Sequence, residues 1–358
     1  MKRVKRIALL APLLTPLLCL TPTAARAPQR QAADGDEVVR ISSDLVVLDA
    51  LVLDKKKGRP IGGLRAEDFE LYEDGVRQEI GYFGQSELPL SIMFLLDVSG
   101  SVRPILASIS EGALDALRQL QPHDEVAVMA FANSTQLVQG FTRDRRLVAE
   151  KIREASWADR LGSGTFLNEA LYEAAGYMPG ASNPASRRVI IVVTDNIAPP
   201  AKGRTAERAL GDLAESGTVV YGLIVRGGLG KALNVMTLGL LHAVDSYADE
   251  TGGEVIGAGK KEVEEKLASV IAHLRARYNL GYRPTNASED GRPRRIRLQL
   301  SRAAAEAAAR RKEKPYVRTR QSYYFRRRAS SVQTRASESA DGRRPRVEQE
   351  RRRFQTSL

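Results

Sequence analysis

One carboxylate and two hydroxyls stand at alternate positions in a short loop. Asp97, Ser99 and Ser101 directly follow the apolar run 92–96, whose five residues predict a buried parallel strand. The loop therefore lies where a strand ends and the chain turns toward a helix, which is where ligands bind in open α/β sheets. Because three oxygens at this spacing can converge on one point, they suit a hard divalent cation, which prefers oxygen ligands.

Two further oxygen-bearing residues complete this candidate site. Thr165 follows a Gly-Ser-Gly stretch at the start of a predicted helix, and the glycines allow its loop to approach closely. Asp195 lies at the end of the strand predicted over 189–193. All the pieces thus belong to strand ends or helix starts of one sheet, so we expect them to meet at its rim.

The elements that must position these residues alternate between strand and helix from about 90 to 276. Apolar runs predict strands at 92–96, 126–131, 189–193, 219–225 and 255–256, and the segments between them carry apolar residues at helical spacing. This alternation predicts an α/β fold, a doubly wound and mostly parallel sheet covered by helices on both faces.

The segments on either side of this region are predicted to be β-rich. A turn at Asp74-Gly75 between two strand-like runs is a strong hairpin signal. After the α/β region, strands are predicted at 278–282, 294–300 and 316–325, with an alanine-rich helix at 302–312. Since a small isolated sheet is marginal in water, we expect the two β-rich segments to form one module.

The two ends of the chain differ from the body in composition. Four basic residues, an apolar stretch at 7–20 and small residues near Ala25 and Ala27 predict a secretory signal peptide with cleavage there. The single cysteine, Cys19, lies inside it, so no disulfide is expected in the mature protein. The chain carries a formal charge of +12, and the tail 326–358, with ten arginines against four acids, is predicted to be disordered.

These observations divide the chain into five predicted parts. They are a signal peptide (1–27), an N-terminal β-rich segment (36–86), the α/β domain (90–276), a C-terminal β-rich segment (277–325) and the basic tail (326–358). The tail suits attraction to an anionic envelope surface or simple solvation, and no specific nucleic-acid partner is expected of an exported protein. No second apolar run is long enough to span a membrane, so an integral membrane protein is not expected.

The five candidate positions resemble a known metal site. Asp97, Ser99, Ser101, Thr165 and Asp195 match the metal-ion-dependent adhesion site of the von Willebrand factor type A domain, over about 90–276. The family's usual glycine after the last aspartate is Asn196 here. The flanking segments are similar to the leader and C-terminal module of a bacterial, largely acidobacterial, group of secreted von Willebrand-related proteins.

The resemblance implies a binding mode. Members of the family hold Mg²⁺, with Mn²⁺ or Ca²⁺ as alternatives, partly through water, and use the ion's open position to capture an acidic side chain of a protein partner. The residues agree with this mode, because two aspartates and three neutral hydroxyls would leave a bound ion electrophilic. The resemblance names no particular partner.

Catalytic interpretations are weaker. An aspartate after a buried strand suits a phosphohydrolase nucleophile, but that chemistry usually needs a second acid where Ser99 stands. None of the three histidines, His123, His242 and His273, lies in a catalytic motif. The stretch 227–232 lacks the spacing and the hydroxyl residue of a phosphate-binding loop.

The sequence therefore favours an exported, divalent-metal-dependent protein-binding module, adhesive or scaffolding, and not an enzyme. The first alternative is a structural envelope protein whose β-rich segments carry the interaction while the metal only stabilises loops. The second alternative is a metal-dependent hydrolase. The sequence leaves the periplasm, the outer envelope and the medium open as destinations.

Overall fold

The computed structural model describes residues 45–85, 88–102, 106, 113–114, 116–155, 159–196, 203–225, 243–259, 261–286, 288 and 291–324. The predicted signal peptide, the basic tail, the stretch 227–232 and His242 lie outside these residues. Among the helices of the described ranges, none is both long and apolar enough to cross a membrane.

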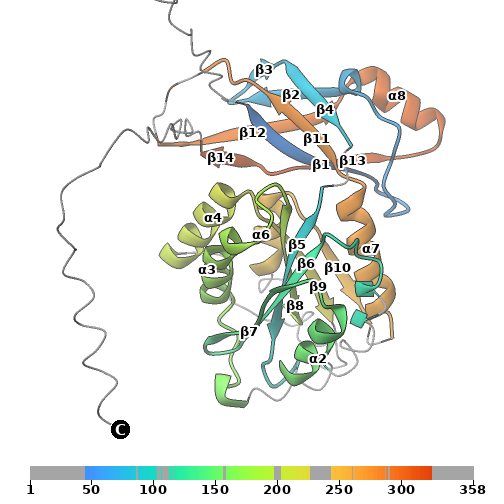
Figure 1. Ribbon diagram of the computed structural model, residues 1–358. Helices are drawn as coiled ribbons and strands as arrows, with labels where there is room; N and C mark the ends of the chain where they lie inside the picture. Colours follow the sequence, from blue (N-terminus) through green and yellow to red (C-terminus); the bar gives the residue numbers. More distant parts are fainter. Residues whose placement is uncertain are drawn as a thin grey trace, which may run out of the picture. The chain divides into compact units, whose positions relative to one another are not determined.

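A six-stranded sheet forms the centre of the α/β domain (Figure 1). Its strands run parallel except for the edge strand β7, which pairs antiparallel with β6. In sheet order the strands are β10 (Val255–Ala258), β9 (Val219–Val225), β8 (Arg187–Thr194), β5 (Leu90–Asp97), β6 (Glu125–Phe131) and β7 (Thr135–Thr142). The predicted mostly parallel α/β sheet is confirmed.

Helices cover both faces of this sheet, which explains why its inner strands are apolar at successive positions. Along β5, Phe94 and Leu96 pack into one core with Val148 of α2 and Leu267 of α7, whereas Met93 and Leu95 pack into a second core on the opposite face. The helices and short 3₁₀ turns of the domain are α2 (Arg145–Ala155), η2 (Asp159–Leu161), α3 (Leu167–Tyr177), η3 (Met178–Gly180), α4 (Arg204–Ser216), α6 (Ala243–Thr251) and α7 (Val263–Arg275).

Strands from both ends of the described chain build a second module, here called the β module. It consists of two four-stranded sheets, in the orders β13-β1-β11-β4 and β14-β12-β2-β3. Its elements are β1 (Val46–Asp54), η1 (Ala66–Asp68), β2 (Phe69–Glu73), β3 (Val76–Gln78), β4 (Ile80–Gly84), β11 (Tyr278–Tyr282), β12 (Pro293–Leu300), α8 (Arg302–Arg310), β13 (Pro315–Arg318) and β14 (Ser322–Tyr324).

The two β-rich segments share strands and a core. Val46 of β1 pairs with Tyr282 of β11, and Leu71 of β2 pairs with Leu298 of β12. Side chains from both segments form one apolar cluster. Each sheet contains strands from both segments, which agrees with the expectation of a single module.

The predicted hairpin at Asp74-Gly75 is confirmed. Asp74 and Gly75 both have positive φ, 47° and 84°, and Glu73 pairs with Val76 across the turn. Two positive φ values give the backbone twist that joins two adjacent strands through a two-residue loop, and glycine and aspartate tolerate them.

Two predicted strands are each divided in the structure. The run after the hairpin breaks at Glu79, so that β3 pairs with β2 and β4 pairs with β11 in the other sheet. Likewise 316–325 becomes β13 and β14, which pair with β1 and β12. In both places the chain crosses from one sheet to the other, and apolar alternation carries no sign of such a crossing.

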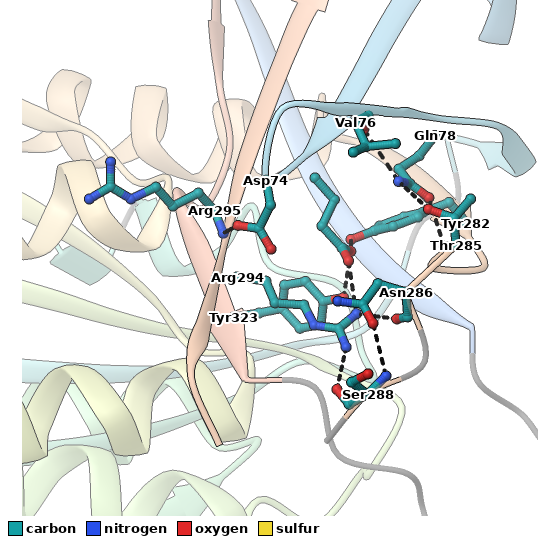
Figure 2. A network of polar contacts seen from close by, with 11 residues as sticks. Asp74, Val76, Gln78, Tyr282, Thr285, Asn286, Ser288, Arg294, Arg295 and Tyr323 are labelled. Carbon is teal, nitrogen blue, oxygen red and sulfur yellow. Dashed lines mark hydrogen bonds and ion pairs between the residues drawn. The ribbon is translucent and has the colours of Figure 1, made fainter. Parts of the chain in front are cut away.

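A buried polar network ties the β module together (Figure 2). Glu73, at the end of β2, accepts hydrogen bonds from Tyr282 (2.5 Å) and Tyr323 (2.7 Å), and pairs with Arg294 of β12 (2.8 Å). Arg294 also donates to the carbonyl oxygens of Asn286 and Ser288. Burial raises the pKa of both tyrosines, so they remain neutral donors to Glu73.

Candidate metal centre

The carboxyl ends of two adjacent parallel strands bring Asp97 and Thr194 together. Asp97 ends β5 and Thr194 ends β8, and the preceding residues, Leu96 and Val193, are partners in the sheet. The Thr194 hydroxyl donates to Asp97 Oδ2 at 2.7 Å. The side chain of Asp97 is thus buried and fixed at the rim of the sheet.

The loop after β5 brings the two serine hydroxyls side by side. The Ser99 N–H donates to Asp97 Oδ1 at 2.9 Å, and the Ser99 and Ser101 Oγ atoms lie 3.3 Å apart. The Val98 N–H donates to the Phe131 carbonyl at the end of β6, which holds the loop against the neighbouring strand. Ser99 is buried and Ser101 is exposed, so this oxygen cluster reaches the surface on the Ser101 side.

The surroundings of Asp97 oppose its ionisation. Burial raises its pKa from the usual 3.8 to about 6, and the charge of Asp195 adds to the rise, although hydrogen bonds from Ser99 and Thr194 lower the pKa. Burial disfavours the ionised form of Asp97. A cation beside the carboxylate would stabilise that form.

Thr165 and Asp195 lie at the same edge of the sheet. Phe166, directly after Thr165, donates its N–H to the Ala132 carbonyl just beyond β6, the strand that neighbours β5. Asp195 follows β8 directly and is close enough for its charge to act on Asp97. Hydrogen bonds join Asp97, Ser99 and Ser101, whereas within the described part of the chain Thr165 makes none to the other four positions.

Asn133 shapes the loop that carries Thr165. Its side-chain Oδ1 accepts from the Gly164 N–H at 2.5 Å. A Cβ atom at Gly162, where φ is +87°, would lie 2.8 Å from Asn133 Cγ, and one at Gly164 would lie 2.5 Å from Asn133 Oδ1. The glycines therefore permit the close approach predicted for this loop, and Asn133 is the neighbour that requires it.

Asn196 keeps the backbone conformation that a glycine would adopt at this position. Its φ is +61°, in the left-handed region that asparagine tolerates better than most residues. The side chain donates to Asp245 at 2.8 Å and accepts from the Val244 N–H at 3.3 Å, at the start of α6. The departure from the family's glycine is therefore compatible with the loop geometry, and it fixes the loop after β8 to α6.

The donor set fits a hard divalent ion. All five predicted side chains offer oxygen, the ligand atom that Mg²⁺ and Ca²⁺ prefer, and the two serine oxygens lie 3.3 Å apart, close enough for both to contact one ion. In the described ranges no group of three or more His, Cys, Asp or Glu side chains could hold a metal. A site at this rim would therefore depend on hydroxyls.

Three of the residues that support this geometry are not among the five predicted ligands. Thr194 orients Asp97, Asn133 holds the glycine loop, and Asn196 connects the last loop to α6. Thr194 and Asn196 flank Asp195 at the end of a predicted strand, so their position in the sequence could have indicated a supporting role. Asn133 acts on a loop about thirty positions away, and the sequence carries no local signal of that contact.

The two described histidines have no visible catalytic partner. His123 is exposed in the turn before β6, and His273 is buried in α7, where its Nδ1 lies 2.8 Å from Glu254 Oε2. In the described residues neither histidine is hydrogen-bonded to a serine hydroxyl. His273 is a packing residue that sits beside an acidic partner.

Comparison with solved structures finds proteins of similar fold at low identity. An aerotolerance-related membrane protein from Bacteroides fragilis is 15% identical, with a TM-score of 0.39, over 52% of this chain and 98% of its own. PilB minor pilin from Streptococcus sanguinis is 13% identical, with a TM-score of 0.39, over 54% of this chain and 63% of its own. Proximal thread matrix protein 1 from the mussel byssus, in a structure with a zinc-occupied MIDAS motif, is 14% identical, with a TM-score of 0.40. The match covers 52% of this chain and 48% of the byssus protein.

A family comparison identifies the central domain. No curated protein matches the chain. The family model of the von Willebrand factor type A domain matches residues 92–197, a range that contains all five predicted metal ligands, most of β5 and all of β6, β7 and β8. The chain therefore contains a von Willebrand factor type A domain in its central region.

Proposed function

We propose that this chain is an exported protein-binding module, adhesive or scaffolding, that holds a divalent cation and captures an acidic side chain of a partner. The proposed ligands are Asp97, Ser99, Ser101, Thr165 and Asp195. The observation that carries the proposal is the fixed geometry of Asp97. Both of its carboxylate oxygens accept hydrogen bonds, from Ser99 and Thr194, beside the paired serine hydroxyls.

The charges of the donor set support capture of an acidic group. Two aspartates and three neutral hydroxyls leave a bound Mg²⁺, Mn²⁺ or Ca²⁺ electrophilic toward an incoming carboxylate. Asp97 and Ser99 are buried, while Ser101 is exposed and Thr165 is half-buried. A partner would therefore approach from the side of Ser101 and Thr165, and the proposed role is binding rather than catalysis.

The two ends of the sequence support the remaining parts of the proposal. Residues 1–27 have the composition of a secretory signal, which supports the proposed export to the periplasm, the outer envelope or the medium. The ten arginines of 326–358 give the tail an attraction to anionic surfaces that is screened over about 8–10 Å in physiological salt.

A second candidate function is favoured by the β module. Val47 and Tyr82 are 43% and 47% exposed, and both pair with Gly281 of β11, so they stand on one face of the sheet, on the two strands that flank β11. Exposed apolar side chains gathered on one face of a sheet are typical of contact surfaces. In this alternative the β module carries the interaction, and the metal only stabilises the loops of the α/β domain.

Thermal unfolding with and without metal tests the proposed site. An ion that binds only the folded state stabilises it by about 2.7 kcal/mol at a hundredfold excess over the dissociation constant. Mg²⁺ should therefore raise the melting temperature of the wild-type protein, and chelator should reverse the rise. Asp97→Ala and Thr165→Ala should abolish most of the response, whereas Glu264→Ala, on the exposed side of α7, should retain it.

Thr165→Ala is the more informative variant, because Thr165 makes no hydrogen bond in the described structure and its removal should leave the metal-free melting temperature unchanged. A full Mg²⁺ response in both site variants would refute the ligand assignment. The second candidate function predicts that partner binding persists in chelator and is lost in Tyr82→Ser. Loss in chelator with retention in Tyr82→Ser supports the metal-dependent function.

A further inference from the structure

Phe166 is an exposed aromatic side chain directly beside a proposed metal ligand. It follows Thr165 and is 49% exposed, whereas Phe69, Phe94 and Phe131 are at most 4% exposed. An isolated exposed apolar residue is ordinary on a protein surface. Its position next to the proposed site is what makes this one informative.

Hydrogen bonds fix the backbone of Phe166 on both sides. Its N–H donates to the Ala132 carbonyl at 3.0 Å, and its carbonyl accepts from the Ala170 N–H at 3.1 Å, the bond that begins α3. Its ring lies over the glycine loop, because a Cβ atom at Gly164 would be only 3.1 Å from Phe166 Cε2. The aromatic ring is therefore presented from a rigid element.

Neither capping nor packing accounts for a phenylalanine at this position. Phe166 is the N-cap of α3 and makes no side-chain cap hydrogen bond. Ser, Thr, Asp and Asn are strongly preferred at N-caps, because their side chains satisfy the free N–H groups of the first turn. The residue is 49% exposed and belongs to neither apolar core of the domain, so core packing does not explain it either. Residues that depart from local preferences without a structural gain are typical of functional sites.

We infer that Phe166 is a specificity-determining contact of the proposed metal site, and that the partner presents an Asp or Glu with an apolar side chain within two residues of it. This inference rests on the proposed function. Thr165 and Phe166 have Cα atoms about 3.8 Å apart, and an extended chain advances about 3.3 Å per residue. A partner whose carboxylate reaches the metal can therefore place a neighbouring side chain on the ring, where rigid aromatic residues concentrate binding energy.

A displayed peptide library tests this inference with the full chain. The probe is a phage library in which one fixed Asp is flanked by five random residues on each side, with a second library in which Asn replaces Asp. Both are selected on immobilised protein in Mg²⁺ and eluted with chelator. Three proteins are compared: wild type, Phe166→Ser and Tyr172→Ser. Tyr172 is 39% exposed on the same helix, six positions away and on a different face, so it is a matched control.

The expected result has two parts. Wild type and Tyr172→Ser should enrich Asp peptides with Leu, Ile, Val, Met or Phe within two positions of the acid. Phe166→Ser should still enrich Asp over Asn peptides but lose the apolar preference, and its affinity for the best wild-type peptide should fall about tenfold, as for a contact worth 1.4 kcal/mol. Its melting response to Mg²⁺ should stay that of wild type.

Each contrary outcome has a separate meaning. Chelator-eluted Asp peptides without an apolar preference in wild type, or the same preference in Phe166→Ser, would overturn the role of Phe166 and leave the proposed function intact. No enrichment of Asp over Asn in wild type would overturn capture of an acidic group, and the inference with it.

Discussion

Asn196 shows how one residue can substitute for another through its backbone. It adopts a φ of +61°, which glycine reaches freely, asparagine reaches at modest cost and β-branched residues rarely reach. In return its amide joins Asp245 and the Val244 N–H. The position next to Asp195 is thus specified by a conformation together with two hydrogen bonds.

Substitutions at Asn196 separate these two contributions. Asn196→Gly keeps the backbone and should lower the free energy of unfolding by about 1 kcal/mol for the lost hydrogen bonds. Asn196→Val adds strain of about 1–3 kcal/mol and should also weaken the Mg²⁺ response, because the strain falls beside Asp195. Urea unfolding with and without Mg²⁺ measures both. Equal stability of the two variants would mean that the positive φ imposes no constraint.

The places of Asp97 and Asp195 in the fold could be predicted from the sequence because strand ends are visible there. Apolar runs locate the ends of β5 and β8, and the carboxyl ends of adjacent parallel strands must meet at one rim. Asn133 and Phe166 could not be assigned roles in this way. The first acts through a contact with a distant loop, and the second is informative only once its exposure and its place on the helix are known.

The turn between α6 and β10 depends on the absence of a side chain. At Gly253 a Cβ atom would lie 1.8 Å from the Val220 carbonyl oxygen, so the backbone of the turn packs directly on β9. Gly257, within β10, has no heavy atom within 4 Å of the same ideal position. Close packing therefore requires glycine at Gly253, whereas at Gly257 there is room for a side chain.

An alanine at each glycine tests this difference. Gly253→Ala should destabilise the protein by about 3 kcal/mol, toward the upper end for overpacking, because the obstructing atom is backbone. Gly257→Ala should be neutral or stabilising by up to about 1 kcal/mol, since it restricts only the unfolded chain. Chemical denaturation gives both values, and a Gly253→Ala protein as stable as wild type would show that β9 and the turn can separate at little cost.

Helices and strands could be predicted where the apolar residues of a segment follow a single spacing, either helical or alternating. The helix at 302–312, the strand at 278–282 and the hairpin at Asp74-Gly75 appear as α8, β11 and the β2–β3 turn. The division of the β module into two sheets was not predictable. Glu79 and the stretch between β13 and β14 carry the chain from one sheet to the other, and only tertiary pairing reveals such crossings.

The Glu73 network connects the two β-rich segments, and its loss should affect the whole β module. Glu73→Ala removes the buried carboxylate that pairs with Arg294 and accepts from Tyr282 and Tyr323, which should cost about 3–5 kcal/mol. Glu306→Ala is the matched control, because it removes the exposed Arg302–Glu306 pair, worth at most about 1 kcal/mol. Equilibrium unfolding of both variants gives the comparison, and equal losses would mean that the buried network contributes nothing beyond a surface pair.

Removal of the C-terminal strands tests whether the β module is one unit. A chain ending at residue 276 lacks the partners of β1, β2 and β4, so limited proteolysis should cleave within 46–84 while the α/β domain stays protected. If 46–84 remained as resistant as in the full chain, the N-terminal strands would fold without the C-terminal ones.

Glu73 and its hydrogen-bond partner Tyr323 are 250 positions apart in the sequence, so the ribosome makes Glu73 long before Tyr323. At about 5–20 residues per second, β1 to β4 precede their last partners by roughly 12–50 seconds. The apolar side chains of Leu48, Val52 and Leu71 have no completed core to enter during that interval. The order of translation therefore leaves these strands without their partners for a period that ends only when the last strands emerge. During this period either a chaperone protects the strands or they are exposed to aggregation.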